Sequence, residues 1–224
     1  MKLQILQENL EKAVSTTSRF ASTRAQLPIL GNILLTTKKS KIYISSTNLE
    51  ISASVQIGAK IEEEGEISIP AKVISELVAN LPKETITLSA EKEQLKVSTS
   101  GFSSTILGMN ASDFPKVPNL IDREKAMSFS QIDLVHALTQ VLFATSADET
   151  RPILTGVLFL FKKNILSLVA TDGFRLSRKN LSIKSEEDIS MVIPKTVLGE
   201  LSRIVSEDEN ILLGIQDKEK QVIF

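Results

Sequence analysis

The sequence predicts an α+β fold made of two tandem copies of one domain, each with two helices packed on antiparallel sheets. Residues 26–52 (QLPILGNILLTTKKSKIYISSTNLEIS) align without a gap with residues that begin at 150 (TRPILTGVLFLFKKNILSLVATDGFRL). The offset of 124 residues, 152 − 28, pairs Pro28 with Pro152 and Thr47 with Thr171. Most of each copy shows the alternating or short apolar runs that are typical of strands, and two stretches per copy have helical spacing.

Eight strands and two helices are expected in the first copy. The strands are expected at 1–5, 31–37, 41–46, 50–57, 66–69, 84–90, 94–99 and 102–108. One helix has an apolar stripe that runs from Leu6 to Phe20, and the other has a stripe from Val73 to Leu81 with its start at Pro70 or Ala71. The first copy therefore reads as strand, helix and three strands, and then the same order again.

The second copy repeats this order, with helices expected near 130–144 and 195–205. The boundary is expected within NASDFPKVPNLIDREK, where Pro115 and Pro118 interrupt regular structure. We assign the first domain to residues 1–118 and the second to residues 124–224. The offset aligns Phe224 with about Ser100, so the strand expected at 102–108 has no counterpart and the second domain lacks its last strand. We therefore expect the 224 residues to be part of a longer chain.

The composition excludes several classes of protein. Hydrophobic residues make up 42% and charged residues 24%, which is typical of a globular chain. The 26 Lys and Arg nearly balance the 27 Asp and Glu, so any polyanion must be bound by a local patch. With no cysteine there is no disulfide or thiolate metal site, and we expect no metal and no cofactor. No secretory signal or apolar run of membrane-span length is visible, so a cytoplasmic protein that does not bind membranes is expected.

Catalytic motifs are also missing from the sequence. Neither G-x-x-x-x-G-K-[ST] nor G-x-G-x-x-G occurs, and His136 is the one histidine. We therefore expect no enzymatic activity and no catalytic residue. One enzyme class stays open, a hydrolase that uses Asp172 together with Asp148 or Glu149.

Basic residues are placed off the apolar stripes of the predicted helices. They are Lys12 in the first helix, Arg24 after it, and Lys72, Lys195 and Arg203 in the short helices. Such charges are most often simply solvated. The chain has one Tyr and no Trp, which argues against single-strand recognition by base stacking.

Four motifs resemble one known family when they are taken together with the duplication. LPILGN at 27–32, TNLE at 47–50, SDFP at 112–115 and ATDGFRL at 170–176 resemble the bacterial sliding clamps, the β subunits of DNA polymerase III. The resemblance implies a three-domain chain whose third clamp domain is absent from this sequence. It also implies that two such chains close head to tail into a ring around double-stranded DNA, with helices lining the hole. The expected function is that of a processivity factor without sequence specificity.

The resemblance also implies site residues and partners. Arg24 and Arg151 would contact DNA phosphates, beside the basic helix residues. A groove for partner peptides would include Leu154, Thr171, Gly173, Phe174, Arg175 and Leu176. Its ligands would be the polymerase III catalytic subunit, the clamp loader and other proteins with a clamp-binding motif. Phe102 and Ile106, on the edge strand 102–108, are the candidate homodimer interface.

Two alternatives to a clamp remain at this stage. One is a scaffold that shares the duplicated fold but binds proteins and no DNA. The other is the carboxylate-dependent hydrolase, in which Asp172 would be the catalyst. The second copy has Asp172, Gly173 and Phe174 where the first copy has Asn48, Leu49 and Glu50. The interpretation that we favour is a turn made by Asp172 beside a peptide-binding surface.

Overall fold

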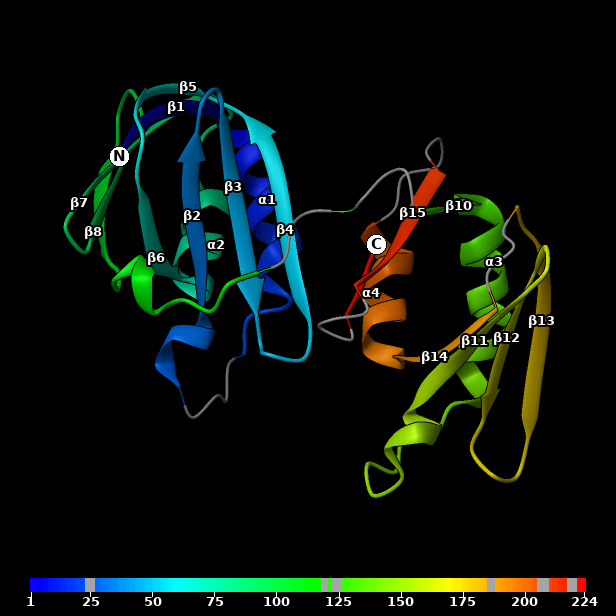
Figure 1. Ribbon diagram of the computed structural model, residues 1–224. Coiled ribbons are helices and arrows are strands. Elements are labelled where there is room, and N and C mark those ends of the chain that lie inside the picture. The colour runs from blue at the N-terminus through cyan, green and yellow to red at the C-terminus, as the bar shows by residue number, and fades with distance from the viewer. Residues whose placement is uncertain (23–26, 118–120, 122–125, 185–187, 205–209, 217–220) are drawn as a thin grey trace. The chain divides into compact units, whose positions relative to one another are not determined.

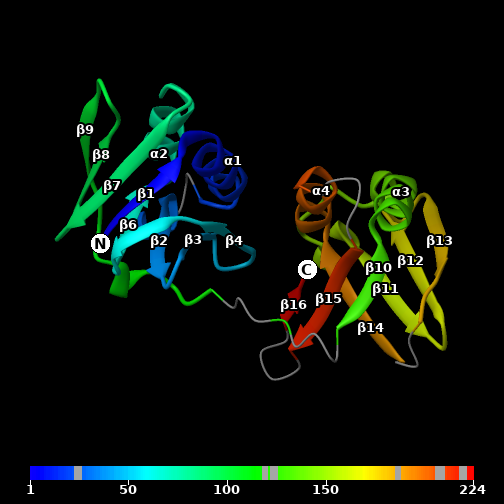
Figure 2. The same ribbon diagram turned by 90° about the horizontal axis from the view of Figure 1, so that it is seen from above.

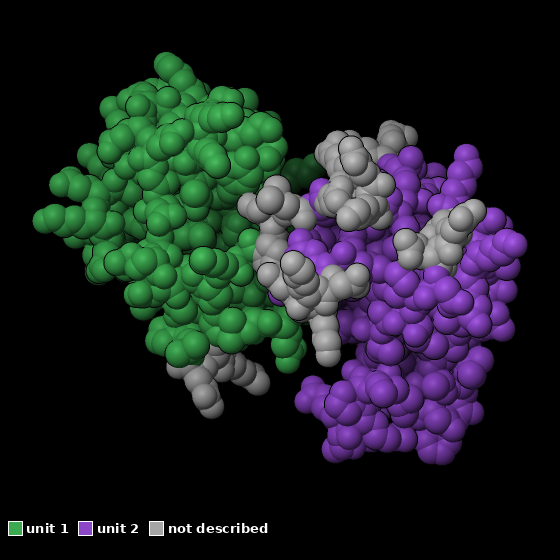
Figure 3. Space-filling model, viewed as in Figure 1, with its two compact units in different colours: residues 1–119 green, residues 120–224 purple. Residues whose placement is uncertain are grey.

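The computed structural model describes residues 1–22, 27–117, 121, 126–184, 188–204, 210–216 and 221–224. The chain forms two compact units, Met1–Asn119 and Leu120–Phe224, which are coloured separately in Figure 3. Each unit combines helices with antiparallel sheets (Figures 1 and 2). The predicted α+β class is confirmed.

The described residues of unit 1 form two sheets and two α-helices (Figure 1). The first sheet has the order β5 (Lys60–Glu63), β1 (Lys2–Leu6), β7 (Thr85–Glu91), β8 (Gln94–Ser98) and β9 (Ser103–Leu107). The second sheet has the order β4 (Ser52–Gly58), β3 (Lys41–Thr47), β2 (Asn32–Lys38) and β6 (Glu66–Pro70). The helices are α1 (Gln7–Ser18) and α2 (Ala71–Ala79), which pack against each other. Short 3₁₀ turns span Pro28–Gly31 and Ala111–Asp113.

The core of unit 1 follows from the two periodicities of its sequence. Leu3 and Ile5 of β1 alternate with more exposed residues and are buried together with Ile33 of β2. Leu10 of α1 and Ile74 of α2 are fully buried against the same cluster. Each such side chain stabilises the fold by roughly 1.5–3 kcal/mol relative to an exposed position. The opposite faces of both helices are left to solvent.

Unit 2 repeats this arrangement with fewer strands. One sheet has the order β13 (Leu176–Ser182), β12 (Ile165–Thr171), β11 (Gly156–Lys162) and β14 (Ile189–Pro194). The other has the order β10 (Met127–Ser130), β15 (Asn210–Gln216) and β16 (Gln221–Ile223). The helices are α3 (Gln131–Val141) and α4 (Lys195–Ile204), and 3₁₀ turns span Leu142–Ala144 and Pro152–Thr155.

Up to α4, the offset of 124 relates the helices and most strands of the two units, and among the described residues β5 has no counterpart in unit 2. The strands β2, β3 and β4 become β11, β12 and β13 with identical lengths, as the first residues show: 156 − 32, 165 − 41 and 176 − 52 are all 124. Beyond α4 the offset grows. Ile211 pairs with Phe129 as Ile86 pairs with Ile5, and 211 − 86 is 125.

The register of the last strand corrects one detail of the sequence alignment. Gln221 pairs with Gln216 as Gln94 pairs with Glu91, and 221 − 94 is 127. Phe224 therefore corresponds to Val97, since 224 − 127 is 97, and the expected match with Ser100 was three residues too far along. Among the described residues of unit 2, no strand corresponds to β9.

Two observed elements differ from what the sequence predicts. The strand β5 was not predicted, because Ile61 is the one apolar residue among its four. Helix α1 ends at Ser18 instead of reaching Phe20. The hydroxyl groups of Thr16 and Thr17 donate to the carbonyl oxygens four residues earlier, at 2.8 and 2.9 Å, and such bonds compete with helix continuation.

Candidate functional site

The turn between β12 and β13 is held by hydrogen bonds from its own first two side chains. Asp172 Oδ1 accepts from the backbone nitrogens of Phe174 and Arg175, both at 3.0 Å, and Oδ2 accepts from Arg175 Nε at 2.9 Å. Thr171 Oγ1 donates to the Arg175 carbonyl oxygen at 2.7 Å and accepts from Gly173 N at 3.1 Å. Gly173 has φ +94°, a left-handed conformation that favours glycine.

These contacts explain why Asp172 is a structural residue. The backbone N–H groups of Arg175 and then Phe174 hold the pKa of the Asp172 carboxyl below its usual value, because they stabilise its charged form. A carboxylate with a lowered pKa whose two oxygens are engaged in a turn is a weak general base. The prediction that Asp172 forms a turn is confirmed, and the arrangement gives no support to a hydrolase.

Unit 1 contains the same turn without a charge. Asn48 Oδ1 accepts from the backbone nitrogens of Glu50 and Ile51, at 3.0 and 2.8 Å. Thr47 Oγ1 donates to the Ile51 carbonyl oxygen at 3.1 Å and accepts from Leu49 N at 3.0 Å. Leu49 has φ +76° at the place of the glycine. The turn is therefore a property of the duplicated fold, and an amide oxygen suffices for it.

Two guanidinium groups connect this turn to neighbouring segments. Arg175 lies over the ring of Phe143, 5.4 Å from its centroid, within the range of a cation–π contact. Arg151 Nε donates to Asp148 Oδ2 at 3.0 Å, and a side-chain carbon added to Gly173 would lie 3.6 Å from an Arg151 nitrogen. The turn, Leu142–Ala144 and Pro152–Thr155 thus meet at one place, which we call the unit 2 corner.

The unit 2 corner displays apolar side chains to solvent. Phe174 is 96% exposed, Ile153 74%, Leu176 67% and Phe143 56%. Leu154 is half-buried in the segment Pro152–Thr155. Five of the six predicted groove residues, Thr171, Gly173, Phe174, Arg175 and Leu176, lie in the turn or at the strand ends that it joins. Phe143 and Ile153 belong to the same surface but were not predicted, and Phe143 has no marker in the sequence beyond its position outside the apolar stripe of the helix.

The two copies show which exposures are specific to unit 2. Phe174 and Leu176 stand where unit 1 has Glu50 and Ser52, so exposed polar residues have been replaced by apolar ones. Ile153 keeps the residue type of its counterpart Ile29, which is buried in a cluster with Phe114. Because Phe174 and Leu176 differ in residue type from their counterparts, they are the stronger evidence for a docking surface.

Four of the predicted DNA-contacting residues lie at exposed positions of helices. These are Lys12 in α1, Lys72 in α2, and Lys195 and Arg203 in α4. Lys72 Nζ lies 3.9 Å from Glu76 Oε1, and Arg203 donates to Glu200 Oε1 at 2.7 Å. Exposed acidic residues such as Glu8 of α1 and Glu76 of α2 share these helices, so their solvent faces are mixed in charge.

The other two predicted DNA contacts are not on helices. Arg24 lies outside the described residues. Arg151 lies at the unit 2 corner, where it pairs with Asp148. Hydrogen bonds from the Thr150 hydroxyl, the Thr150 backbone and Arg151 lower the pKa of the Asp148 carboxyl, so this loop is held by a charged aspartate.

The prediction that the Ile106 side chain belongs to the homodimer interface is wrong. Ile106 is 6% exposed and packs into the core of unit 1, because it pairs with the buried Leu95 of β8. Its neighbour Leu107 is 70% exposed, and Phe102, in the turn before β9, is 42% exposed. The outward side chains of this region are therefore those of Phe102 and Leu107.

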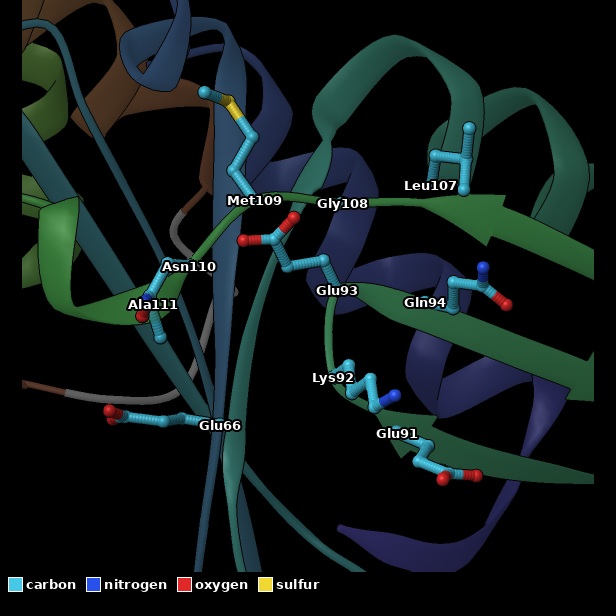
Figure 4. A pocket seen from close by; sticks show the side chains of 10 residues that line it. All are labelled: Glu66, Glu91, Lys92, Glu93, Gln94, Leu107, Gly108, Met109, Asn110 and Ala111. Carbon is cyan, nitrogen blue, oxygen red and sulfur yellow. The ribbon is translucent and has the colours of Figure 1, made fainter.

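A surface concavity of about 980 Å³ lies at the end of β9, and it is shown in Figure 4. Its lining comes from β6, the β7–β8 hairpin and the chain after β9: Glu66, Glu91, Lys92, Glu93, Gln94, Leu107, Gly108, Met109, Asn110 and Ala111. A second concavity of about 370 Å³ lies between β10, α3 and β13. Neither includes a predicted groove residue. Within the described ranges, no three His, Asp or Glu side chains are grouped to hold a metal ion, and no helix is long and apolar enough to cross a membrane.

Known proteins resemble the chain along its entire length. The Synechococcus elongatus beta sliding clamp is 32% identical over 222 residues, which is 95% of this chain and 59% of that protein. The Synechocystis beta sliding clamp is 31% identical and covers 100% of this chain and 63% of its own length. The crystal structure of the Bacillus subtilis DNA polymerase sliding clamp superposes with a TM-score of 0.91 at 28% identity, over 96% of this chain and 60% of that one.

Two family assignments follow the observed units. Residues 1–118 match the family described as DNA polymerase III beta subunit, N-terminal domain. Residues 129–224 match the family described as DNA polymerase III beta subunit, central domain. Because these adjacent matches cover nearly all of the sequence, the chain belongs to the DNA polymerase III beta subunit family, the beta sliding clamps.

Proposed function

We propose that the full-length protein is a DNA polymerase processivity factor, a ring-forming clamp that encircles duplex DNA without sequence specificity. The observation that carries this proposal is the pair of adjacent family matches on two units that repeat one fold. The chain spans about 60% of the length of its relatives, so ring closure needs residues outside it. Two copies of the full-length protein would form the ring, which acts in the cytoplasm as a subunit without catalytic activity.

The mixed charge of the helix faces suits a sliding contact. A face that neutralised many phosphates would release many counterions and bind tightly, whereas a ring remains attached through topology. The ion pairs of Lys72 with Glu76 and of Arg203 with Glu200 leave these cations partly compensated before DNA arrives. Lys12 and Lys195, together with Arg24 and Arg151, complete the proposed set of phosphate contacts. None of these contacts would read bases, which fits binding at any sequence.

The unit 2 corner is the proposed site for partner peptides. Phe174 and Leu176 supply exposed apolar area, and the half-buried Leu154 would form part of the floor. Thr171 and Gly173 act through the turn, because the Thr171 hydroxyl is already bonded within it. Arg175 is held by Asp172 and Phe143 and forms a fixed positive rim. The proposed ligands are the polymerase III catalytic subunit, the clamp loader and other proteins with a clamp-binding motif.

DNA synthesis on a long primed circular template tests this function. With the clamp loader and the polymerase III catalytic subunit present, the full-length protein should lengthen the products made in one binding event. The double variant Phe174→Ala/Leu176→Ala should lose this effect, because it removes the apolar side chains that are proposed to bind the partner peptide. The fold should be kept, since both side chains are exposed. Products of equal length with and without the wild-type protein would contradict the proposal.

A further inference from the structure

The turn between β12 and β13 contains an aspartate that is followed by a glycine. No other aspartate and no asparagine of the 224 residues precedes a glycine. In such a pair the glycine nitrogen can attack the side-chain carboxyl carbon, because glycine has no side chain to hinder the approach. Gly173 is exposed, so water reaches the pair. Asp172 and Gly173 therefore form a candidate site of spontaneous chemical modification.

The reaction at this pair needs no reagent other than water. A bond forms between Gly173 N and Asp172 Cγ, and the hydroxyl group of the protonated carboxyl leaves with the amide proton as water. Water then opens the cyclic imide. Attack at Cγ restores aspartate, whereas attack at the main-chain carbonyl carbon of Asp172 breaks its bond to Gly173 N and leaves isoaspartate. The main chain of isoaspartate runs through Cβ and Cγ and is longer by one carbon.

The closed turn keeps both reacting groups engaged. The nucleophile, Gly173 N, donates to Thr171 Oγ1 at 3.1 Å. The Asp172 carboxylate accepts from Phe174 N and Arg175 N, both at 3.0 Å, and from Arg175 Nε at 2.9 Å. The backbone donors also lower the pKa of this carboxyl, and its charged form is the unreactive one. The reaction is therefore expected in molecules whose turn has opened locally.

Unit 1 has the same turn without the reactive pair. Asn48 accepts the two equivalent backbone hydrogen bonds, but Leu49 follows it. A leucine side chain hinders attack by its own backbone nitrogen. Leu49 pays for this with φ +76°, whereas Gly173 takes its φ of +94° without strain. The relaxed turn of unit 2 is thus the chemically reactive one.

We propose that Asp172–Gly173 converts spontaneously to isoaspartate, that Thr171 and Arg175 restrain this conversion while the turn is closed, and that the converted unit 2 corner binds partner peptides less well. In isoaspartate the carboxylate is attached directly to Cα and the main chain is longer, so the observed bonds to Phe174 N and Arg175 are lost. Arg175 is then released from its position over Phe143. The chemical step depends on the turn alone, and its effect on binding rests on the proposed function.

Storage of the full-length protein in heavy-oxygen water measures the chemical step. Each passage through the imide adds one solvent oxygen at residue 172, which peptide mapping by mass spectrometry detects. The folded wild type should convert more slowly than the same protein kept unfolded in guanidinium chloride. Thr171→Val should convert about threefold to tenfold faster than the folded wild type, because lost hydrogen bonds raise the open population of the turn.

Two results of this measurement would overturn the proposal. Equal rates in the folded and unfolded wild type would remove the restraint by the turn. Unlabelled Asp172 in the unfolded protein would remove the site itself.

The turn of unit 1 supplies matched controls. Thr47→Val removes the equivalent hydroxyl and should leave Asn48 unconverted, because Leu49 is retained. Leu49→Gly gives Asn48 a glycine neighbour and should start its conversion, in which ammonia leaves instead of water. Conversion of Asn48 in Thr47→Val that is as fast as conversion of Asp172 in Thr171→Val would contradict the role of the glycine.

Peptide binding by the stored full-length protein tests the effect on function. The fraction that binds a clamp-motif peptide should fall in step with the isoaspartate content at residue 172. An isoaspartate-specific methyltransferase with S-adenosylmethionine returns isoaspartate to aspartate and should restore binding. Full binding by converted protein, or a loss that this treatment does not reverse, would overturn the functional effect. Fresh protein that does not bind the peptide would overturn the proposed groove, and the labelling result would be unaffected.

Discussion

Arg175 binds Asp172 twice, from its backbone nitrogen to Oδ1 at 3.0 Å and from Nε to Oδ2 at 2.9 Å. One carboxylate therefore fixes both the path of the turn and the direction of the guanidinium group. The guanidinium is placed over Phe143 as a result. In unit 1 the equivalent Asn48 fixes the path alone. The second copy of a structural turn has thus gained an oriented cation beside apolar side chains.

This difference gives a test of Asp172. Asp172→Asn keeps an oxygen for the two backbone N–H groups, so we expect the turn to remain and the stability to fall less than in Asp172→Ala. Peptide binding by the full-length Asn variant should weaken, because Arg175 is released from its fixed position. Urea unfolding and titration with a clamp-motif peptide measure the two effects. Equal stability losses in both variants would contradict the turn assignment.

The pH dependence of the same variants has a defined sign. The pKa of Asp172 is lowered in the folded protein, so its contribution to stability is fully present above the unfolded pKa of about 3.9. The contribution is lost as the pH falls through the lower folded value. The stability difference between wild type and Asp172→Asn should therefore be constant from about pH 7 to pH 5 and shrink below about pH 4. A difference that grows on acidification would contradict the direction of the shift.

Gly173 allows a test of the backbone at the unit 2 corner. Its φ of +94° is unfavourable for a residue with a Cβ, so Gly173→Ala should lower the free energy of unfolding by about 1 kcal/mol. Leu49→Gly, at the equivalent position of unit 1, should relieve a similar conformation and cost little or nothing. Urea denaturation compares them. A loss in Leu49→Gly that matches the loss in Gly173→Ala would show that the two turns are not equivalent.

Gly108 is a second position that requires glycine, here because of close packing. A Cβ at this residue would overlap the Ser68 carbonyl oxygen and would lie 2.8 Å from Ile69 Cδ1. Gly108→Ala should destabilise the protein by roughly 1–3 kcal/mol, as overpacking does. Gly58→Ala is the control, since its Cβ would meet nothing within 4 Å. Thermal unfolding measures both variants, and Gly108→Ala should have the lower midpoint. Equal midpoints would contradict the close contact between the end of β9 and β6.

The docking surface is tested by truncating its exposed anchor. Leu176→Ala in the full-length protein should weaken the binding of a clamp-motif peptide by about tenfold, a loss of about 1.4 kcal/mol in binding free energy. The stability of the fold should not fall, because Leu176 is exposed. The matched control is Leu49→Ala, which removes an exposed leucine from the corresponding turn of unit 1. Calorimetric titration gives both affinities. An unchanged affinity for Leu176→Ala would remove this residue from the groove.

Most of the fold could be predicted because the sequence contains it twice. A helix start at Gln7 implies one at Gln131, and the structure has both. The strand Lys60–Glu63 was not predicted, because three of its four residues are charged and it shows no alternation of apolar and polar residues. It is recognised as a strand by its pairing with β1. The insertions after α4 were also not predicted, because they are revealed by the pairing register of the strands and not by residue identity.

The functional residues were predictable to different degrees. Asp172 could be assigned to a turn because Asn48 occupies the same place in the repeat. Ile106 was misplaced because an edge strand also has an inward face, and the sequence alone does not say which residues occupy it. Phe143 became part of the corner through Arg175, a contact between segments 32 residues apart, 175 − 143, that no local pattern encodes.

Retention on DNA tests the central claim most directly. The full-length protein is loaded onto a nicked circular duplex, and the DNA is then either left circular or cut once. Topological attachment predicts a long lifetime on the circle at high salt and rapid loss from the ends of the linear form, because sliding needs no tight grip on the phosphates. Equal lifetimes on circular and linear DNA would contradict the proposed clamp.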